Sequence, residues 1–239
     1  MGHPKVVPVI MEHMAKELET EHPYQVIRSS YRASEIGKCP RYQAYKQLGF
    51  KQEKINAQLS LLFRMGHIVE EEVVGLLRRS GFVVTNQQHV GFKTFTVDGT
   101  TINVTASLDI LLDGKYIMDA KSTNFFTFKY LTKDYILKKY KTYYDQIQTY
   151  LNVVEGPGIS EWGCLLFYEK MTSRLAEFWF KRDKHYFEND IIPRLIKIEK
   201  AVLQRKIVPR PKGFTSSTQD CERCPMRLPC WKKPMKVRD

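Results

Sequence analysis

The sequence contains no apolar run that approaches the roughly 20 residues of a membrane-spanning helix. Its N-terminal stretch, MGHPKVVPVIMEHMAKELE, has no long apolar segment and soon reaches charged residues, so it does not resemble a secretory signal peptide. Internal repeats and low-complexity linkers are also absent. We therefore expect an intracellular protein with no membrane partner.

Cysteine is scarce as well, with five residues in a chain of 239. That number is low for a disulfide scaffold, and an intracellular protein is not expected to need one. Acidic residues are outnumbered, since 26 Asp and Glu stand against 38 Lys and Arg and give a net charge of +12. A chain this basic favours a polyanionic partner, because each neutralised phosphate releases condensed counterions.

The remaining composition is that of an ordinary globular protein, with 43% hydrophobic and 27% charged residues. The length suffices for one sizeable core with appendages. Periodicity predicts helices at about 9–21, 34–48, 60–80, 134–154 and 183–205, and strands within about 82–121, 162–168 and 174–180. This order of elements predicts an α/β fold with helices packed on a mixed sheet.

The segment SLDILLDGKYIMDAKST places acidic residues on two successive strands. Asp119 and Lys121 are two residues apart and share one face of their strand. A three-residue loop at 113–115 pairs Asp109 with Asp119 directly, whereas a two-residue loop pairs Asp109 with Met118. Asp109 and Asp119 can form one site only if the loop between their strands has three residues.

Two carboxylates opposed across a strand pair destabilise a sheet. A cation such as Mg²⁺ or Mn²⁺ between them reverses the sign of the interaction. Lys121 beside them would hold or deprotonate a water, or stabilise charge developing on a phosphate. A single D-x-K pattern more often marks an exposed hairpin, so the hypothesis depends on further residues.

Glu70 supplies a third carboxylate on the helix predicted at about 60–80. With Gly66 at zero on a helical wheel, Glu70 falls at roughly 40° and His67 at about 100°. Glu70 thus lies inside an apolar stripe and His67 on its edge; the stripe holds Leu59, Leu62, Phe63, Val69, Val73 and Leu77. A buried carboxylate needs a partner, and a metal ion would serve. We therefore prefer Glu70 as a ligand and keep His67 as the alternative. Gln146 and Tyr150 follow as an i,i+4 pair on a later helix.

The order of these motifs resembles that of the RecB-like PD-(D/E)XK nucleases. The resemblance implies a restriction-endonuclease-like core and a catalytic metal held by Glu70, Asp109, Asp119 and the carbonyl of Ala120. It implies that Lys121 is catalytic and that Gln146 and Tyr150 position DNA near the scissile phosphate. Many relatives carry His where this chain has Glu70, so the choice between Glu70 and His67 stays open.

Four of the cysteines form a second pattern. Cys221, Cys224 and Cys230 are spaced C-x2-C-x5-C, and Cys39 lies far upstream. Such a set can complete a Cys₄ site for an iron–sulfur cluster or for structural zinc. The fifth, Cys164, lies in the apolar run WGCLLFY and is expected in the core.

This cysteine spacing is similar to that of the iron–sulfur subset of the family, which includes the CRISPR-associated RecB-like exonucleases, phage relatives and the AddB nuclease domain. It implies a 4Fe-4S cluster with a mainly structural role. The expected organisation is an N-terminal extension (1–30), a helical segment with the first cluster cysteine (31–58), a nuclease core (59–207) and a cluster-binding tail (208–239). No motif covers the extension.

The stretch KYLTKDYILKKYKTYY interleaves lysines with tyrosines. Lysines could follow phosphates while aromatics stack on unpaired bases. Alternatively, Tyr140, Tyr143 and Tyr144 form a core stripe with Ile136 and Ile147. Basic residues near the C-terminus would add phosphate contacts: Lys232, Lys233, Lys236 and Arg238.

Together, these patterns predict a Mg²⁺- or Mn²⁺-dependent DNA exonuclease that acts on single strands or ends. Its setting would be recombination, repair or replication, in the cytoplasm of a bacterium or of a phage-infected host. A CRISPR adaptation nuclease that processes spacers and a non-catalytic DNA-binding subunit with a Cys₄ zinc site are the alternatives. A homo-oligomer, or partners among recombination or CRISPR proteins, stays open.

Overall fold

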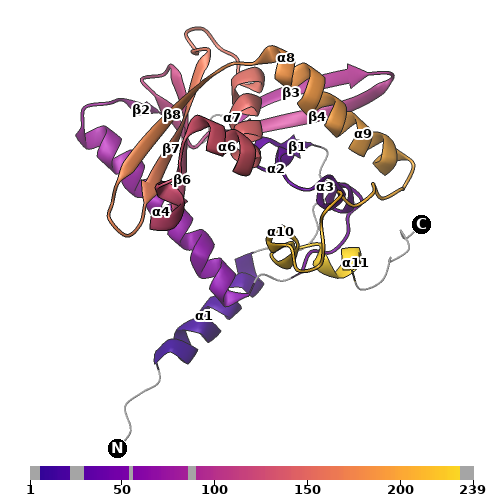
Figure 1. Cartoon of the computed structure of the whole chain (residues 1–239), viewed down its shortest axis with the longest axis horizontal. Coiled ribbons are helices and arrows are strands. Elements are labelled where there is room, and N and C mark those ends of the chain that lie inside the picture. Colours follow the sequence, from indigo (N-terminus) through magenta and orange to yellow (C-terminus); the bar gives the residue numbers. More distant parts are fainter. Residues whose placement is uncertain (1–5, 22–29, 54–55, 86–89, 232–239) are drawn as a thin grey trace, which may run out of the picture.

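The computed structural model describes residues 6–21, 30–53, 56–85 and 90–231. Two mixed sheets carry the fold (Figure 1). The first holds, in spatial order, β1 (Tyr31–Arg32), β4 (Thr100–Ser107) and β3 (Val90–Val97); the second holds β2 (Val84–Thr85), β5 (Ile110–Leu112), β6 (Tyr116–Thr123), β7 (Trp162–Glu169) and β8 (Leu175–Lys181). This is the predicted α/β, restriction-endonuclease-like class, with the strands divided between two sheets instead of one.

Different helices cover the two faces of the five-stranded sheet. α4 (Ala57–Arg79) packs on one face, where Val69 and Val73 join a buried cluster with Met118 of β6. α7 (Lys141–Val153) packs on the other face and places Ile147 in the main core. Gly163 of β7 allows this close approach, since a Cβ there would meet Ile147 Cδ1 at 3.0 Å.

One long helical segment covers the three-stranded sheet. It consists of α8 (Lys184–Tyr186), a π-helical turn (Phe187–Ile191) and α9 (Ile192–Leu203). Leu195 and Ile198 of α9 lie in the same buried core as Val104 of β4. The helix predicted at 183–205 is confirmed, with the π-turn as an unforeseen interruption.

The single helix predicted at 134–154 is wrong, because the chain forms α6 (Lys133–Lys139) and α7 with a break at Tyr140. Tyr140 leaves the helical region, with φ −120° and ψ 39°. Its ring stacks on Tyr143 at a centroid distance of 5.2 Å and meets the edge of Tyr135 at 5.8 Å. Aromatic packing at this point competes with helix propagation, which the periodicity of the sequence does not reveal.

The helix predicted at 34–48 is also divided, into α2 (Ala33–Ile36) and α3 (Pro40–Gln47). Pro40 lacks an amide hydrogen and therefore begins a helix more readily than it continues one. Between the two helices, Gly37 lies so close to α7 that a Cβ would be 2.4 Å from Thr142 Cα. Ser34, at the start of the predicted helix, lies inside α2, and Arg32 occupies the N-cap position.

α4 buries its predicted apolar stripe along only part of its length. Val69 and Val73 are buried, but Leu62 and Phe63 are 44% and 51% exposed. The N-terminal half of α4 extends past the sheet, and α1 (Val6–Glu21) lies beside it with Met14 buried (Figure 1). None of the helices in the described ranges is long and apolar enough to cross a membrane.

The C-terminal part of the chain packs against α3. α10 (Gln219–Glu222) and α11 (Arg227–Trp231) flank Met226, which forms a small buried cluster with Tyr42 and Tyr45. The Tyr45 hydroxyl donates a hydrogen bond of 3.0 Å to the carbonyl of Pro229. Segments from the two ends of the sequence thus lie together beside the sheets (Figure 1).

Candidate active site

Asp109 and Asp119 lie opposite each other where the chain passes from one sheet to the other. Asp109 occupies a bend between β4 and β5, and β5 pairs with β6 in the register Ile110↔Met118. One step further along this register sets Asp109 across from Asp119. Asp113 and Gly114 adopt left-handed backbone angles, φ 52° and 64°, in the connecting turn. The predicted three-residue register is therefore confirmed.

The Asp119 carboxylate is completely buried and is held by two cationic or amide donors. Gln146 of α7 donates from Nε2 to Asp119 Oδ1 at 3.0 Å, and Lys121 Nζ lies 2.6 Å from Asp119 Oδ2. Lys121 also donates to Gln146 Oε1 at 3.2 Å and lies 5.0 Å from the centre of the Tyr143 ring. Gln146 further donates to the Tyr150 hydroxyl at 2.6 Å. Contacts between β6 and α7 therefore hold Asp119, Lys121 and Gln146 in place.

The carboxyl groups perturb one another. Burial, and after it the neighbouring Asp119, raise the pKa of Asp109 to about 9, while Lys121 opposes both. Burial also raises the pKa of Glu70, and Asp119 contributes in the same direction. For Lys121 burial lowers the pKa, but Asp119 and Asp109 outweigh it, so the net pKa lies above its usual value. Carboxyl groups whose pKa values are raised in this way are stabilised by positive charge placed beside them.

Glu70 and His67 lie differently on α4. Glu70 is half-buried and faces the acidic group, as its electrostatic coupling to Asp119 and Lys121 shows. The His67 side chain is 78% exposed, with Nδ1 at 3.9 Å from Glu70 Oε2. The structure therefore brings Glu70 together with the strand carboxylates and leaves His67 at the rim.

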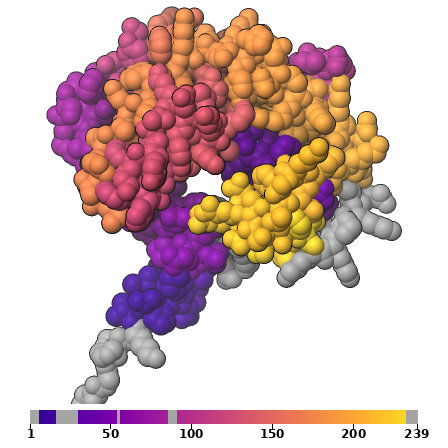
Figure 2. All heavy atoms as spheres, in the orientation of Figure 1, coloured from indigo at the N-terminus to yellow at the C-terminus, as the bar shows by residue number. Residues whose placement is uncertain are grey.

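Most of these groups border one cleft of about 1120 Å³, whereas Asp119 and Tyr150 are buried and do not line it. Its floor holds Glu70, Asp109, Ala120, Lys121 and Gln146. Its walls come from the N-terminal half of α4, the end of β6, the β7–β8 turn and α10: Leu62, Phe63, Arg64, His67, Asn124, Lys170 and Arg223. Figure 2 shows the molecule hollowed here, with an opening between the α6 region, α4 and the C-terminal segment.

Sequence reasoning missed several wall residues. Arg223 stands next to Cys224 inside the C-x2-C motif, and Asn124 follows Lys121 by three residues, so position along the chain offered a weak signal for both. Lys170 reaches the cleft only because the backbone N–H of Lys170 donates to Thr123 O at 3.2 Å. No local pattern predicts that contact.

The lysine- and tyrosine-rich stretch is divided between the two interpretations. Tyr140 and Tyr143 line the cleft, whereas Tyr144 packs on Phe180 with a centroid distance of 5.4 Å. Ile136 and Ile147 are buried, as the core alternative expects. The four basic residues expected to add phosphate contacts near the C-terminus lie outside the described residues: Lys232, Lys233, Lys236 and Arg238.

The four cysteines of the second motif line one small cavity between α3 and the C-terminal helices. Cys39 is the N-cap residue of α3, and the other three come from the segment 221–230. Burial raises the pKa of Cys224 to about 11, and the Cys39 thiol nearby contributes to this rise. Arg210 donates to the carbonyl of Cys230 at 2.7 Å. Cys39 and the tail cysteines, far apart in sequence, are therefore neighbours in space.

Two further facts delimit these sites. Among the described residues, no three or more histidine, cysteine or carboxylate side chains already stand in the arrangement of a bound metal ion. A separate apolar cavity of about 790 Å³, lined by Trp162 and Trp179, lies on the α4 side of the sheet and contains none of the predicted site residues. Cys164 is buried in the sheet, as predicted.

No model of a known protein family matches the sequence. A stretch of 80 residues is 34% identical to part of the DNA polymerase II large subunit of Methanocella arvoryzae, but it spans 34% of this chain and 7% of that protein.

Solved structures match over most of the chain. SSO0001 is similar with a TM-score of 0.56 and 14% identity, covering 95% of this chain and 97% of that one. A phage-related exonuclease from Haemophilus somnus 129PT matches with a TM-score of 0.54 and 15% identity, over 76% and 96% of the two chains. The alkaline exonuclease LHK-Exo from Laribacter hongkongensis, in complex with dAMP, matches with a TM-score of 0.51 and 17% identity, over 81% and 95%. The chain thus has the fold of these exonucleases.

Proposed function

We propose that this chain is a Mg²⁺- or Mn²⁺-dependent DNA exonuclease of the RecB-like PD-(D/E)XK type. The observation that carries the proposal is one cleft whose floor holds Glu70, Asp109 and Lys121, with the Asp119 carboxylate buried in contact with Lys121. The buried Asp119 lies opposite the partly buried Asp109, and two carboxylates so placed are unfavourable without a cation. No observation favours the CRISPR or non-catalytic alternatives over this one.

The donor set suits a hard divalent cation. Glu70, Asp109, Asp119 and the carbonyl of Ala120 would hold it, since Mg²⁺ and Mn²⁺ prefer oxygen ligands. Asp119 Oδ2 is buried and accepts no hydrogen bond of ordinary geometry from the described residues, although Lys121 lies beside it. When bound, such an ion supplies a Lewis acid that stabilises charge on phosphate and lowers the pKa of a water ligand.

The protein's own groups would orient the reacting atoms. Lys121 is cationic and borders the cleft, so its ammonium can donate to the attacking water or to a phosphate oxygen. Gln146 contacts both Lys121 and Asp119 and holds the two in a fixed relation. Tyr150 accepts from Gln146 and would act through it as a positioning residue.

Single strands or DNA ends are the proposed substrates. The cleft is bordered by cations and by Tyr140 and Tyr143, a combination that suits phosphates and unpaired bases. The similar structures from Laribacter hongkongensis and Haemophilus somnus are exonucleases, and the first was solved in complex with dAMP, a deoxynucleoside monophosphate of the kind that an exonuclease releases. Recombination, repair or replication is the setting we propose.

We also propose that Cys39, Cys221, Cys224 and Cys230 hold a 4Fe-4S cluster, with residues 208–239 acting as a cluster-binding tail. Four thiols around one cavity fit such a cluster. Purified protein should then absorb in the visible range and lose this absorption in Cys224→Ala, whereas a zinc protein would be colourless. Colourless wild-type protein that contains zinc would contradict the cluster.

Cleavage of end-labelled single- and double-stranded DNA with Mn²⁺ or Mg²⁺ tests the activity. Asp119→Ala and Lys121→Ala should each lower the rate by roughly 10²-fold or more, because each loses charge at the reacting centre. Asp190→Asn, which changes an exposed carboxylate, is the matched control. Full activity in both site variants would refute the proposal.

A further inference from the structure

Two exposed aromatic side chains lie directly after the strand that carries Asp119 and Lys121. Phe126 is 70% exposed and Tyr130 is 63% exposed. Phe126 belongs to α5 (Phe125–Phe128), and Tyr130 lies two residues beyond the end of that helix. Large aromatic rings so open to water commonly mark a contact surface.

The backbone beneath these rings is fixed. Asn124 caps α5, because its side-chain oxygen accepts from the Thr127 N–H at 2.9 Å, and the Tyr130 N–H donates to Thr127 O at 3.0 Å. Phe128 packs against the main core. The Arg174 guanidinium of the β7–β8 turn lies 4.8 Å from the Phe128 ring centre. This contact holds α5 against the turn. Phe126 therefore projects from a rigid base.

Positive charge accompanies the aromatic surface. Lys129 Nζ lies 5.8 Å from the Phe126 ring centre and 5.0 Å from that of Phe125. Lys170 borders the adjoining cleft. A ring with ammonium groups beside it can stack on a base while the cations contact the flanking phosphates.

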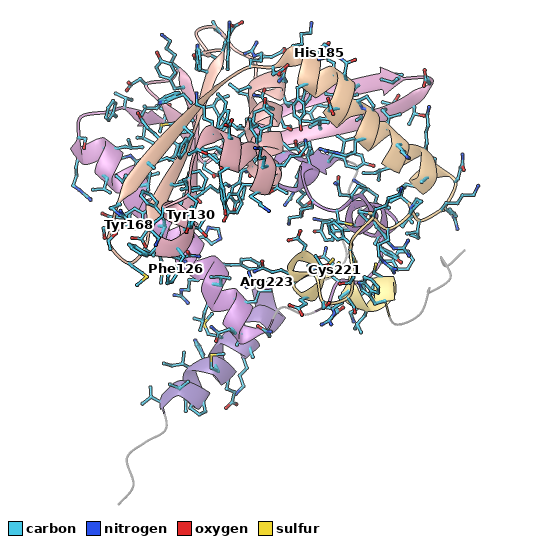
Figure 3. All side chains as sticks on the ribbon, in the orientation of Figure 1. Phe126, Tyr130, Tyr168, His185, Cys221 and Arg223 are labelled. Atoms are coloured by element: carbon cyan, nitrogen blue, oxygen red, sulfur yellow. The ribbon has the colours of Figure 1, made fainter. Side chains whose placement is uncertain are left out.

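The position of this surface connects it to the cleft. Asn124, the residue that caps α5, lines the same cleft as Lys121. Figure 3 shows Phe126 and Tyr130 on one side of the opening and Arg223 on the other. A strand that reaches the acidic group past α5 would meet the two rings first.

We propose that Phe126 and Tyr130 form a base-stacking subsite for unpaired nucleotides next to the reacting phosphate. The inference rests on the proposed function and adds a positioning element to it. An apolar patch of this size could instead receive a partner protein. The adjacent lysines and the continuity with the cleft favour a nucleic-acid strand.

Binding of fluorescent single-stranded oligonucleotides tests the subsite without cleavage. The measurement uses the full chain with Asp119→Asn, in EDTA, and compares Phe126→Ala, Tyr130→Ala and Phe126→Trp. Phe92→Ala is the matched control, since Phe92 is 61% exposed but lies on β3, in the other sheet. Loss of one stack should weaken binding roughly tenfold in either alanine variant, and Phe126→Trp should retain affinity.

Oligonucleotides with one abasic nucleotide, moved along the strand, separate stacking from other effects. With Phe126 intact, the strand that lacks one particular base should bind roughly tenfold more weakly than the complete strand. With Phe126→Ala, the two strands should bind equally well, because the stacking partner is already missing. If Phe126→Ala and the removal of a base each weakened binding independently at every position, the subsite would be overturned. Unchanged DNA affinity in Phe126→Ala together with altered self-association or partner binding would also overturn it. Since cleavage is not measured, DNA binding without nuclease activity would refute the proposed function and leave the subsite standing.

Discussion

Replacing Asp109 with Asn should stabilise the metal-free protein while it removes a proposed metal ligand. Burial and the neighbouring Asp119 raise the pKa of Asp109 from 3.8 to about 9. Near pH 7 the folded, metal-free chain therefore keeps a proton that the unfolded chain has released. Stability from this group is fully present below about pH 4 and is lost as the pH rises toward 9.

The magnitude follows from the same pKa values. The interval from 3.8 to about pH 7 corresponds to about 4 kcal/mol, at about 1.4 kcal/mol per pH unit. The cleft admits water, which weakens the electrostatic penalty, so roughly half of this free energy, about 2 kcal/mol, should appear as a gain in Asp109→Asn. The amide cannot ionise, and the variant should lose most of the pH dependence.

Urea unfolding in EDTA near pH 5 and pH 8 measures this difference, provided that the slope with denaturant is unchanged. The gain should be small near pH 5 and largest near pH 8. Mn²⁺ should stabilise the wild type more than Asp109→Asn, because a cation bound only to the folded state adds to its stability. Asp190→Asn should change stability by less than about 0.5 kcal/mol. A variant less stable than wild type near pH 8 in EDTA would refute the reasoning.

Two further changes test how the site is supported. Asp145→Ala should destabilise the chain by about 3–5 kcal/mol in urea unfolding, because buried Asp145 accepts from Arg194 at 2.7 Å and its loss leaves that guanidinium without its carboxylate partner; a loss below about 1 kcal/mol would contradict this role. Gly163→Ala should lower the free energy of unfolding by about 1–3 kcal/mol, because its Cβ would press on Ile147. Gly66→Ala, whose Cβ meets nothing within 4 Å, should instead stabilise α4 by about 0.5–1 kcal/mol. Equal effects of the two glycine changes would show that the close contact between Gly163 and Ile147 does not affect stability.

The sequence predicts the acidic strands well because their geometry is local. Asp109 and Asp119 are joined by a short hairpin, so alternation and turn length determine which side chains meet. The prediction that Asp119 and Lys121 share one face of β6 is confirmed as well, since both contact Gln146 of α7, while Met118 lies in the cluster beneath α4. Neither result requires knowledge of distant segments.

Other features depend on contacts between distant segments and could not be predicted. The helical wheel marks Glu70 correctly as a side chain on the inward face, yet it also predicts burial for Phe63, which is 51% exposed. A periodic pattern shows which residues share a face but not how far along the helix a partner extends. The break at Tyr140 and the approach of Lys170 arise in the same way, from packing between segments distant in sequence.

α7 physically connects the cleft with the cysteine-lined cavity. From this helix Gln146 contacts Asp119, and its neighbour Asp145 pairs with Arg194 of α9. Arg194 also donates to the carbonyl of Ile36, at the end of α2 and just before the segment that leads to Cys39. Because Thr142 packs against Gly37 in that segment, a shift of the Cys39 region would press on α7 and displace the donor that holds Asp119. Loss of the cysteine site should therefore weaken the catalytic geometry through α7 even though the two sites share none of their proposed ligands.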